Sequence, residues 1–81
     1  MRARVTIVPR PEVLDPQGRA VAHALEGLGF GVVKGVRVGR IVDVELSDGL
    51  DRQAAETMLE QMTRELLANL VIEDFRIDWL D

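Results

Sequence analysis

Apolar and polar residues alternate at the start of the chain, with Ala3, Val5 and Ile7 on one side and polar residues between them. A period of two is typical of a strand with one buried face. Pro9 and Pro11 follow directly. Because a proline has no N–H to donate to a neighbouring strand, they predict the end of this one.

Helical spacing replaces the alternation from Pro16 to about Leu28. Asp15 suits the N-cap, where a carboxylate accepts hydrogen bonds from the first turn, and Pro16 suits the first helical position. Gly29 is the predicted residue just after the helix, since glycine adopts a positive φ without strain. The predicted apolar face consists of Ala20 or Val21, Ala24, Leu25 and Leu28.

The segment from Val32 to Leu46 has five apolar residues on one phase of a strand: Val36, Val38, Val42, Val44 and Leu46. Its length of about 15 residues is far beyond the usual five or six of a strand. A hairpin with a three-residue loop at Gly39-Arg40-Ile41 preserves this phase, because it pairs Val38 with Val42. One long bent strand preserves it equally well, but its ends would outrun the core of so short a chain and need another chain. The residues leave both arrangements open.

A second helix is predicted from about Asp51 to Ala68, with Asp48 and Asp51 as rival N-caps and Asn69 as its C-terminal stop. Its apolar stripe is Ala55, Met58, Leu59, Met62 and Leu66. Alternation returns from Ile72 to Leu80 and predicts a last strand. The order βαβ(β)αβ predicts one α+β domain over residues 1–81, a ferredoxin-like two-layer α/β sandwich with both helices on one face of an antiparallel sheet.

Length and charge narrow the possible partners. A chain of 81 residues has a marginal core of its own, yet 47% of it is hydrophobic, so we expect a partner surface. The net charge of −4 disfavours nucleic acid, which needs a basic surface. No apolar run approaches the roughly 20 residues that span a bilayer, and without a signal-peptide pattern we expect a cytoplasmic protein.

Groups for catalysis are scarce. His23 and Ser47 are the only histidine and serine, and neither has the neighbours that acid–base or nucleophilic catalysis requires. The glycine-rich run from Gly27 to Gly31 follows a predicted helix, whereas phosphate-binding loops precede one. Glu73 and Asp74 are adjacent, so in a strand they point to opposite faces. The residues therefore predict no catalytic, cofactor or metal site, and the absence of cysteine excludes thiolate chemistry.

Three phrases of the chain, taken together, resemble the PurS family. They are Val13 to Gly18, Val36 to Arg40 and Leu66 to Asp74, in family-like order and spacing. The chain departs from the family's pattern at Leu70, where proline is usual, and at Arg40, where lysine is usual.

The resemblance implies the small subunit of phosphoribosylformylglycinamidine (FGAM) synthase, a ligase complex of purine biosynthesis (EC 6.3.5.3). In that complex a glutaminase subunit releases ammonia and a synthetase subunit uses it with ATP and magnesium. The small subunit is expected to bridge the two and assist ammonia transfer, without catalysis or a cofactor of its own. The family also implies a segment-exchanged dimer or a dimer of dimers, which favours the long strand.

For such a subunit, the candidate partner contacts are exposed polar groups near the predicted loops. They are Arg10, Asp15, Gln17, Arg37, Arg40 and Asn69. Each of them also suits a cap, a turn or a surface ion pair within the chain.

Two rival functions fit the size and fold class. An acylphosphatase would need an arginine in a phosphate loop and a positioned asparagine, for which Arg10 and Asn69 are the only pair. A ferredoxin-like regulatory dimer that senses a ligand would use the turn from Gly27 to Gly31.

Overall fold

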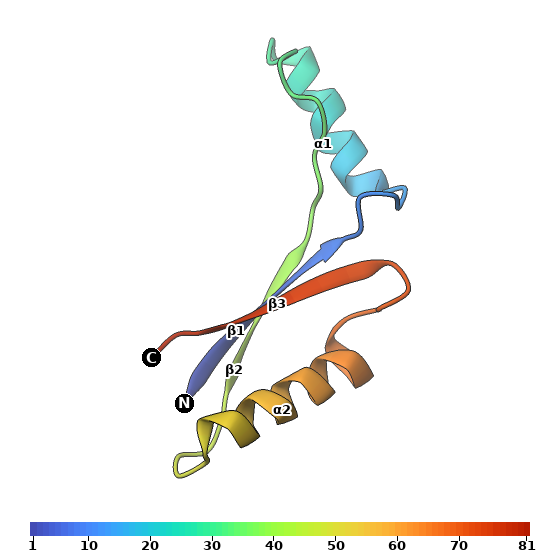
Figure 1. Ribbon diagram of the computed structural model, residues 1–81. Coiled ribbons are helices and arrows are strands. Elements are labelled where there is room, and N and C mark those ends of the chain that lie inside the picture. Colours follow the sequence, from blue (N-terminus) through green and yellow to red (C-terminus); the bar gives the residue numbers. More distant parts are fainter.

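The computed structural model describes residues 1–81 and confirms an α+β fold with an antiparallel sheet. Strand β1 lies in the middle of the sheet, with β2 on one side and β3 on the other (Figure 1). The elements in chain order are β1 (Arg2–Pro9), α1 (Pro16–Gly27), β2 (Arg40–Glu45), α2 (Arg52–Met62), the π-helix η1 (Thr63–Leu67) and β3 (Glu73–Trp79).

The core lies between the sheet and α2. The predicted inward residues of β1 are Ala3, Val5 and Ile7, and all three are wholly buried. The register places Val5 between Val42 of β2 and Ile77 of β3, so that one face of the sheet is apolar. Helix α2 runs along this face (Figure 1) and buries its own inner residues Ala55 and Leu59, and Thr63 at the start of η1 is also buried.

Helix α1 does not cover the sheet. It lies beyond the end of the strands (Figure 1), and Gly18 is its only buried residue. The expectation that both helices cover one face is therefore wrong for the single chain. Strands lie about 4.8 Å apart, so three of them are about as wide as one helix, and α2 already fills that width.

The segment from Val32 to Gly39, which we call the arm, distinguishes between the two predicted arrangements, a hairpin and one long strand. It forms no hairpin with β2 but runs into it without reversing (Figure 1), and only Arg40–Glu45 pair with β1. The hairpin alternative is therefore wrong. The ladder stops at the pair Ile7–Arg40, beside the prolines that end β1, because Pro9 has no N–H to extend it.

Helix termini follow the sequence closely. Asp51 rather than Asp48 is the N-cap of α2, and its carboxylate accepts a hydrogen bond from Ala54 N at 3.3 Å. Gly29 has a φ of 97° just after the end of α1, as predicted.

The predicted second helix is an α-helix up to Met62 and continues from Thr63 as the π-helix η1. The wider π-turn changes the phase of the helix, so that Leu66 is 83% exposed and Leu67 packs against the core instead. The expectation that Leu66 continues the buried stripe is therefore wrong.

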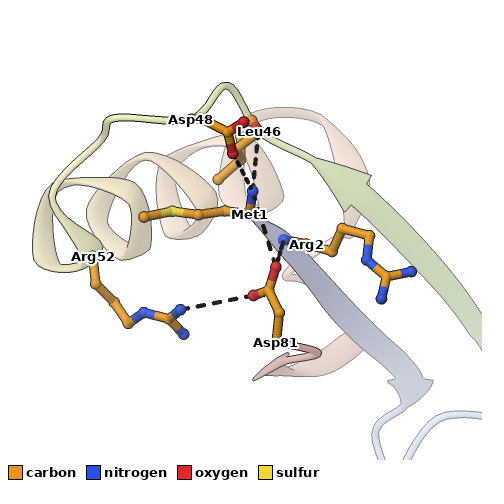
Figure 2. Close-up of polar contacts among 6 residues, drawn as sticks. All are labelled: Met1, Arg2, Leu46, Asp48, Arg52 and Asp81. Atoms are coloured by element: carbon orange, nitrogen blue, oxygen red, sulfur yellow. Dashed lines mark hydrogen bonds and ion pairs between the residues drawn. The ribbon is translucent and has the colours of Figure 1, made fainter.

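Polar contacts tie the chain ends to the start of α2 (Figure 2). The N-terminal ammonium of Met1 donates to the Leu46 carbonyl and lies 3.3 Å from Asp48 Oδ1. Asp81 accepts a hydrogen bond from the backbone N–H of Arg2 at 3.1 Å and pairs with Arg52 at 3.7 Å. Arg52 also lies over the Trp79 ring, 4.3 Å from its centroid, so this half-buried tryptophan packs within the chain.

The molecule is elongated. Its radius of gyration is 16.1 Å and its extents are 51 × 26 × 14 Å. A compact domain of this length has a radius of gyration of about 12 Å. The excess comes from α1 and the arm, which project from the body formed by the sheet, α2 and η1 (Figure 1).

Gly39 lies where the arm passes close to β1, and a methyl group there has no space. A Cβ at this position would lie 2.2 Å from the Ile7 carbonyl oxygen, whereas a Cβ on Gly35 would meet nothing within 4 Å. We expect Gly39→Ala to lower the free energy of unfolding by about 1–3 kcal/mol. Gly35→Ala is the matched control and should leave it nearly unchanged. Urea denaturation followed by circular dichroism measures both, and equal stabilities would contradict the prediction.

Candidate functional site

Glu73, at the start of β3, is the centre of the main polar cluster. Its side chain is largely buried and pairs with Arg40, whose Nη2 lies 3.1 Å from Oε1. The same oxygen accepts a hydrogen bond from the backbone N–H of Asn69 at 2.7 Å. The bond from Arg40, and after it the bond from Asn69, lowers the pKa of Glu73, because both stabilise the charged carboxylate.

Two arginines extend this cluster to four segments of the chain. Arg40, the first residue of β2, also donates to the carbonyl oxygen of Leu67, the last residue of η1. Arg10, just after β1, donates to the Leu70 carbonyl at 2.7 Å and lies 3.5 Å from Asp74 Oδ1. The cluster therefore joins β1, β2, η1 and β3 at one end of the sheet.

An open hollow of about 470 Å³ lies beside this cluster. It is lined by charges of both signs and by two apolar side chains: Arg10, Glu60, Arg64, Leu70, Glu73, Asp74 and Phe75. Arg64 lies over the Phe75 ring at 5.4 Å, and its Nη2 lies 3.9 Å from a Glu60 oxygen. Each arginine faces a carboxylate of its own chain, and the lining offers no hydroxyl, thiol or imidazole. This chemistry suits structural ion pairing and protein contact rather than catalysis.

A second polar group joins the arm to the start of α1 and to the end of β1. Asp15 is the residue before α1, and its Oδ2 accepts a hydrogen bond from the backbone N–H of Val38 at 3.0 Å. This bond, followed by the nearby amides of Gly18 and Gln17, lowers the pKa of Asp15. Arg37 donates to the Pro9 carbonyl at 3.2 Å. The predicted N-cap residue thus bridges two segments, and the geometry gives its side chain no cap hydrogen bond.

Five of the six predicted contact residues fall into these two groups. Arg10, Arg40 and Asn69 gather around Glu73 and Leu70, whereas Asp15 joins the start of α1 to the arm and Arg37 joins the arm to the end of β1. Gln17 is exposed in the first turn of α1. The structure therefore gives five of them bonds within the chain, and their contacts with other subunits stay a prediction.

Neither rival function gains support from the geometry. The turn from Gly27 to Gly31 lines none of the surface hollows. Arg10 lies beside the Asp74 carboxylate, which would repel a phosphate. The Asn69 side chain accepts a hydrogen bond from Val71 N instead of facing a ligand.

The sequence alone did not reveal the role of Glu73. Adjacent carboxylates in a strand point to opposite faces, which correctly separated Glu73 from Asp74. The partners of Glu73 lie 33 residues away at Arg40 and four away at Asn69. No local pattern marks a bond that depends on where two strands start.

No group of three or more His, Asp or Glu side chains is placed to hold a metal ion, and no helix has the length and apolar character needed to cross a bilayer. Fold and site define a small α+β protein of the assembly-subunit class. Its polar groups hold its own chain together, and several large apolar side chains on and around α1 and the arm remain exposed.

Comparison with known proteins identifies the family. The family model described as "PurS: Phosphoribosylformylglycinamidine (FGAM) synthase" matches residues 2–81. The phosphoribosylformylglycinamidine synthase subunit PurS of Mycobacterium leprae is 42% identical over 94% of this chain and 91% of its own length. The Bacillus subtilis subunit is 36% identical over 95% of this chain and 89% of its own. This chain therefore belongs to the PurS family.

Solved structures agree with this assignment. The Bacillus subtilis PurS structure has a TM-score of 0.80 at 35% identity and covers 95% of this chain and 94% of its own. Thermus thermophilus PurS has a TM-score of 0.73 at 34% identity, with 99% of this chain and 96% of its own covered. A chain of the Thermotoga maritima PurLQS structure has a TM-score of 0.83, covers 95% of this chain and 93% of its own, and at 23% identity shows the shared fold.

Because of the Glu73 cluster, the free energy of unfolding should fall at acid pH. A carboxylate whose pKa is lowered by folding stabilises the protein above its ordinary pKa of 4.5, and the effect is lost as the pH falls through the lowered value. We expect Glu73→Gln to cost about 1–2 kcal/mol at pH 7, since it weakens a charge-assisted bond to a half-exposed arginine. Urea titrations from pH 7 to 3 should show the difference shrinking below about pH 4.5. Glu56→Gln, on the exposed side of α2 and without an ion pair, is the control. A pH-independent difference would contradict the assignment.

Proposed function

We propose that this chain is the non-catalytic small subunit of FGAM synthase, which bridges the glutaminase and synthetase subunits and assists ammonia transfer between them. The match to the PurS family over residues 2–81 carries this proposal. The curated relatives are named as subunits of that enzyme, and this chain spans about nine-tenths of their length. We also propose that it acts in the cytoplasm, where purine precursors are made.

The chemistry of the reaction explains the need for a non-catalytic subunit. Ammonia released from glutamine reacts as a nucleophile only while it is unprotonated, so it must reach the synthetase without mixing with bulk water. A subunit that holds two active sites together meets this need by excluding solvent, without a titrating residue of its own. ATP and magnesium belong to the synthetase subunit in this scheme, and this chain binds no cofactor.

Self-association completes the proposed structure, because the single chain leaves one apolar surface open. Large side chains of α1, its flanking loops and the arm are exposed: Leu14, Val21, Leu28, Phe30 and Val32. The backbone N–H groups of residues 34–37 have no hydrogen-bond partner within the chain. We propose a segment-exchanged dimer, or a dimer of such dimers, in which the arm of one copy pairs with a strand of the other.

Reconstitution tests the subunit role. Purified glutaminase and synthetase subunits of the same organism are mixed with and without this chain, with glutamine, ATP and magnesium present. We expect a ternary complex by native mass spectrometry and glutamine-dependent amidine formation only when the chain is present. Ammonium chloride should restore activity without it, because free ammonia reaches the synthetase from solution. Full glutamine-dependent activity in the absence of the chain would overturn the proposed function.

A charge on the apolar face of α1 tests the dimer. Val21 is 40% exposed in the single chain, and burying a glutamate at this position in an interface costs several kcal/mol. We expect Val21→Glu to raise the dimer dissociation constant at least a hundredfold in sedimentation velocity. His23→Glu introduces the same charge on the polar side of α1 and should leave the dimer intact. A monomeric wild-type protein at micromolar concentration would refute the dimer.

A further inference from the structure

Strand β3 is an outer strand of the sheet, and the edge that faces away from β1 is open. Leu80 N donates to the Arg2 carbonyl at 2.9 Å, so the even-numbered residues of this stretch direct their backbone groups toward β1. In an antiparallel pair the residues between them point the other way. The backbone N–H groups of Phe75, Ile77 and Trp79 therefore have no hydrogen-bond partner within the chain.

The side chains of β3 alternate between the two faces of the sheet. Phe75 and Ile77 pack against the apolar core, whereas Arg76 and Asp78 lie on the opposite, outer face. Arg76 Nε lies 2.8 Å from Asp78 Oδ2 along the strand. An open edge pairs well only with a strand whose side chains match it on both faces. The pattern of β3 therefore limits which strand can bind there.

A second copy of β3 matches this edge when the two strands run antiparallel about a two-fold axis at Ile77. Phe75 then lies opposite Trp79 of the second copy on the core face. On the outer face Arg76 lies opposite Asp78 of the second copy, and the symmetry repeats both pairs. The residues with free N–H groups also lie opposite one another, so that the strands exchange backbone hydrogen bonds. Aromatic pairs and pairs of opposite charge across two strands both stabilise a sheet.

Other symmetric registers lose these matches. An axis at Arg76 sets two arginines against each other, and an axis at Asp78 sets two aspartates against each other. An axis at Phe75 restores a pair of opposite charge on the outer face. It also places Ile77 opposite the Glu73 carboxylate, whose oxygens are already bonded within their own chain. Of these four registers, the axis at Ile77 alone suits both faces.

The arm of a second copy is the rival occupant of this edge, and its charges suit β2 better. The arm carries Lys34 and Arg37 and no carboxylate, so it offers Arg76 no opposite charge. Strand β2 carries Asp43 and Glu45, which complement the cations of the arm. Charge thus favours β2 for the arm and leaves the edge of β3 for another strand.

We infer that β3 pairs edge to edge with β3 of a second copy about a two-fold axis at Ile77, and that this pairing joins two dimers into a tetramer. The inference rests on the proposed function, because it gives the proposed dimer of dimers its contact. Each chain then uses the edge of β2 for the exchanged arm and the edge of β3 for the second dimer. No edge of the sheet stays open in such a tetramer.

Charge reversal on the outer face tests this contact. Arg76→Asp leaves only carboxylates at the joint, and Asp78→Arg leaves only guanidinium groups. We expect each variant to raise the dissociation constant of the tetramer about tenfold or more in sedimentation velocity, because like charges face one another. Arg2→Asp makes the same charge change as Arg76→Asp on the central strand β1. It is the matched control and should leave the tetramer intact.

Two further samples keep the test independent of misfolding. An equimolar mixture of the two single variants restores opposite charges across the joint, so mixed tetramers should form in native mass spectrometry. The double variant Arg76→Asp with Asp78→Arg exchanges the two charges, which restores both pairs only when these positions lie opposite each other. We expect its tetramer to have a dissociation constant within about threefold of the wild type. A double variant as weak as the single variants would overturn this register.

The outcomes separate this inference from the proposed function. A wild-type chain that forms the dimer but no tetramer up to its solubility limit overturns the inference and leaves the dimer standing. If Arg76→Asp splits the dimer itself into monomers, the exchanged arm lies along β3 and the inference fails. If the charge variants keep the tetramer but lose the glutaminase or the synthetase, the edge serves a different protein, which also overturns it. If the tetramer shows the expected charge dependence but glutamine-dependent activity does not require the chain, the proposed subunit role fails and the contact stands.

Discussion

The width of the sheet is the constraint on which the rest of this structure depends. Three strands make a layer about as wide as one helix, and α2 covers this layer with its buried residues Ala55 and Leu59. A ferredoxin-like order supplies a second helix, which then has no sheet in its own chain to cover. Helix α1 and the arm consequently stand apart from the body, and the apolar side chains of Val21, Leu28, Phe30 and Val32, on them and in the loop between them, remain exposed. An open structure of this kind leaves apolar surface that another chain can cover.

Polar contacts give the small body its rigidity. Few residues are wholly buried, so the apolar core alone is modest. Glu73 and its two donors hold the start of β2, the end of η1 and the start of β3 in one arrangement. Arg40 is also the residue at which the arm enters the sheet. The same contacts that stabilise the body therefore fix the direction in which the arm leaves it.

Polar groups and exposed apolar groups have different roles in this subunit: the polar groups order the loops, and the apolar groups offer surface for association. Five of the polar residues chosen as partner contacts are already bonded within the chain, which orders the loops around them. The exposed aliphatic side chains lie next to these ordered loops, on α1 and at the end of α2. Ordered backbone beneath an exposed apolar side chain is the arrangement that favours association, because little freedom remains to be lost.

The sequence by itself determined the order of the elements and the buried face of β1, because these depend on neighbours only a few residues apart. Alternation located β1 and β3, Asp15 and Asp51 located the starts of both helices, and the family phrases indicated PurS. Tertiary structure alone decided the place of α1, the outward turn of Leu66 and the partners of Glu73. The place of α1 depends on the width of a sheet built from three distant segments. The outward turn of Leu66 depends on the π-turn, in which Leu67 and Ala68 pack in the core instead. The partners of Glu73 depend on the fact that Arg40 and Glu73 begin two strands at the same end of the sheet, which no local pattern encodes.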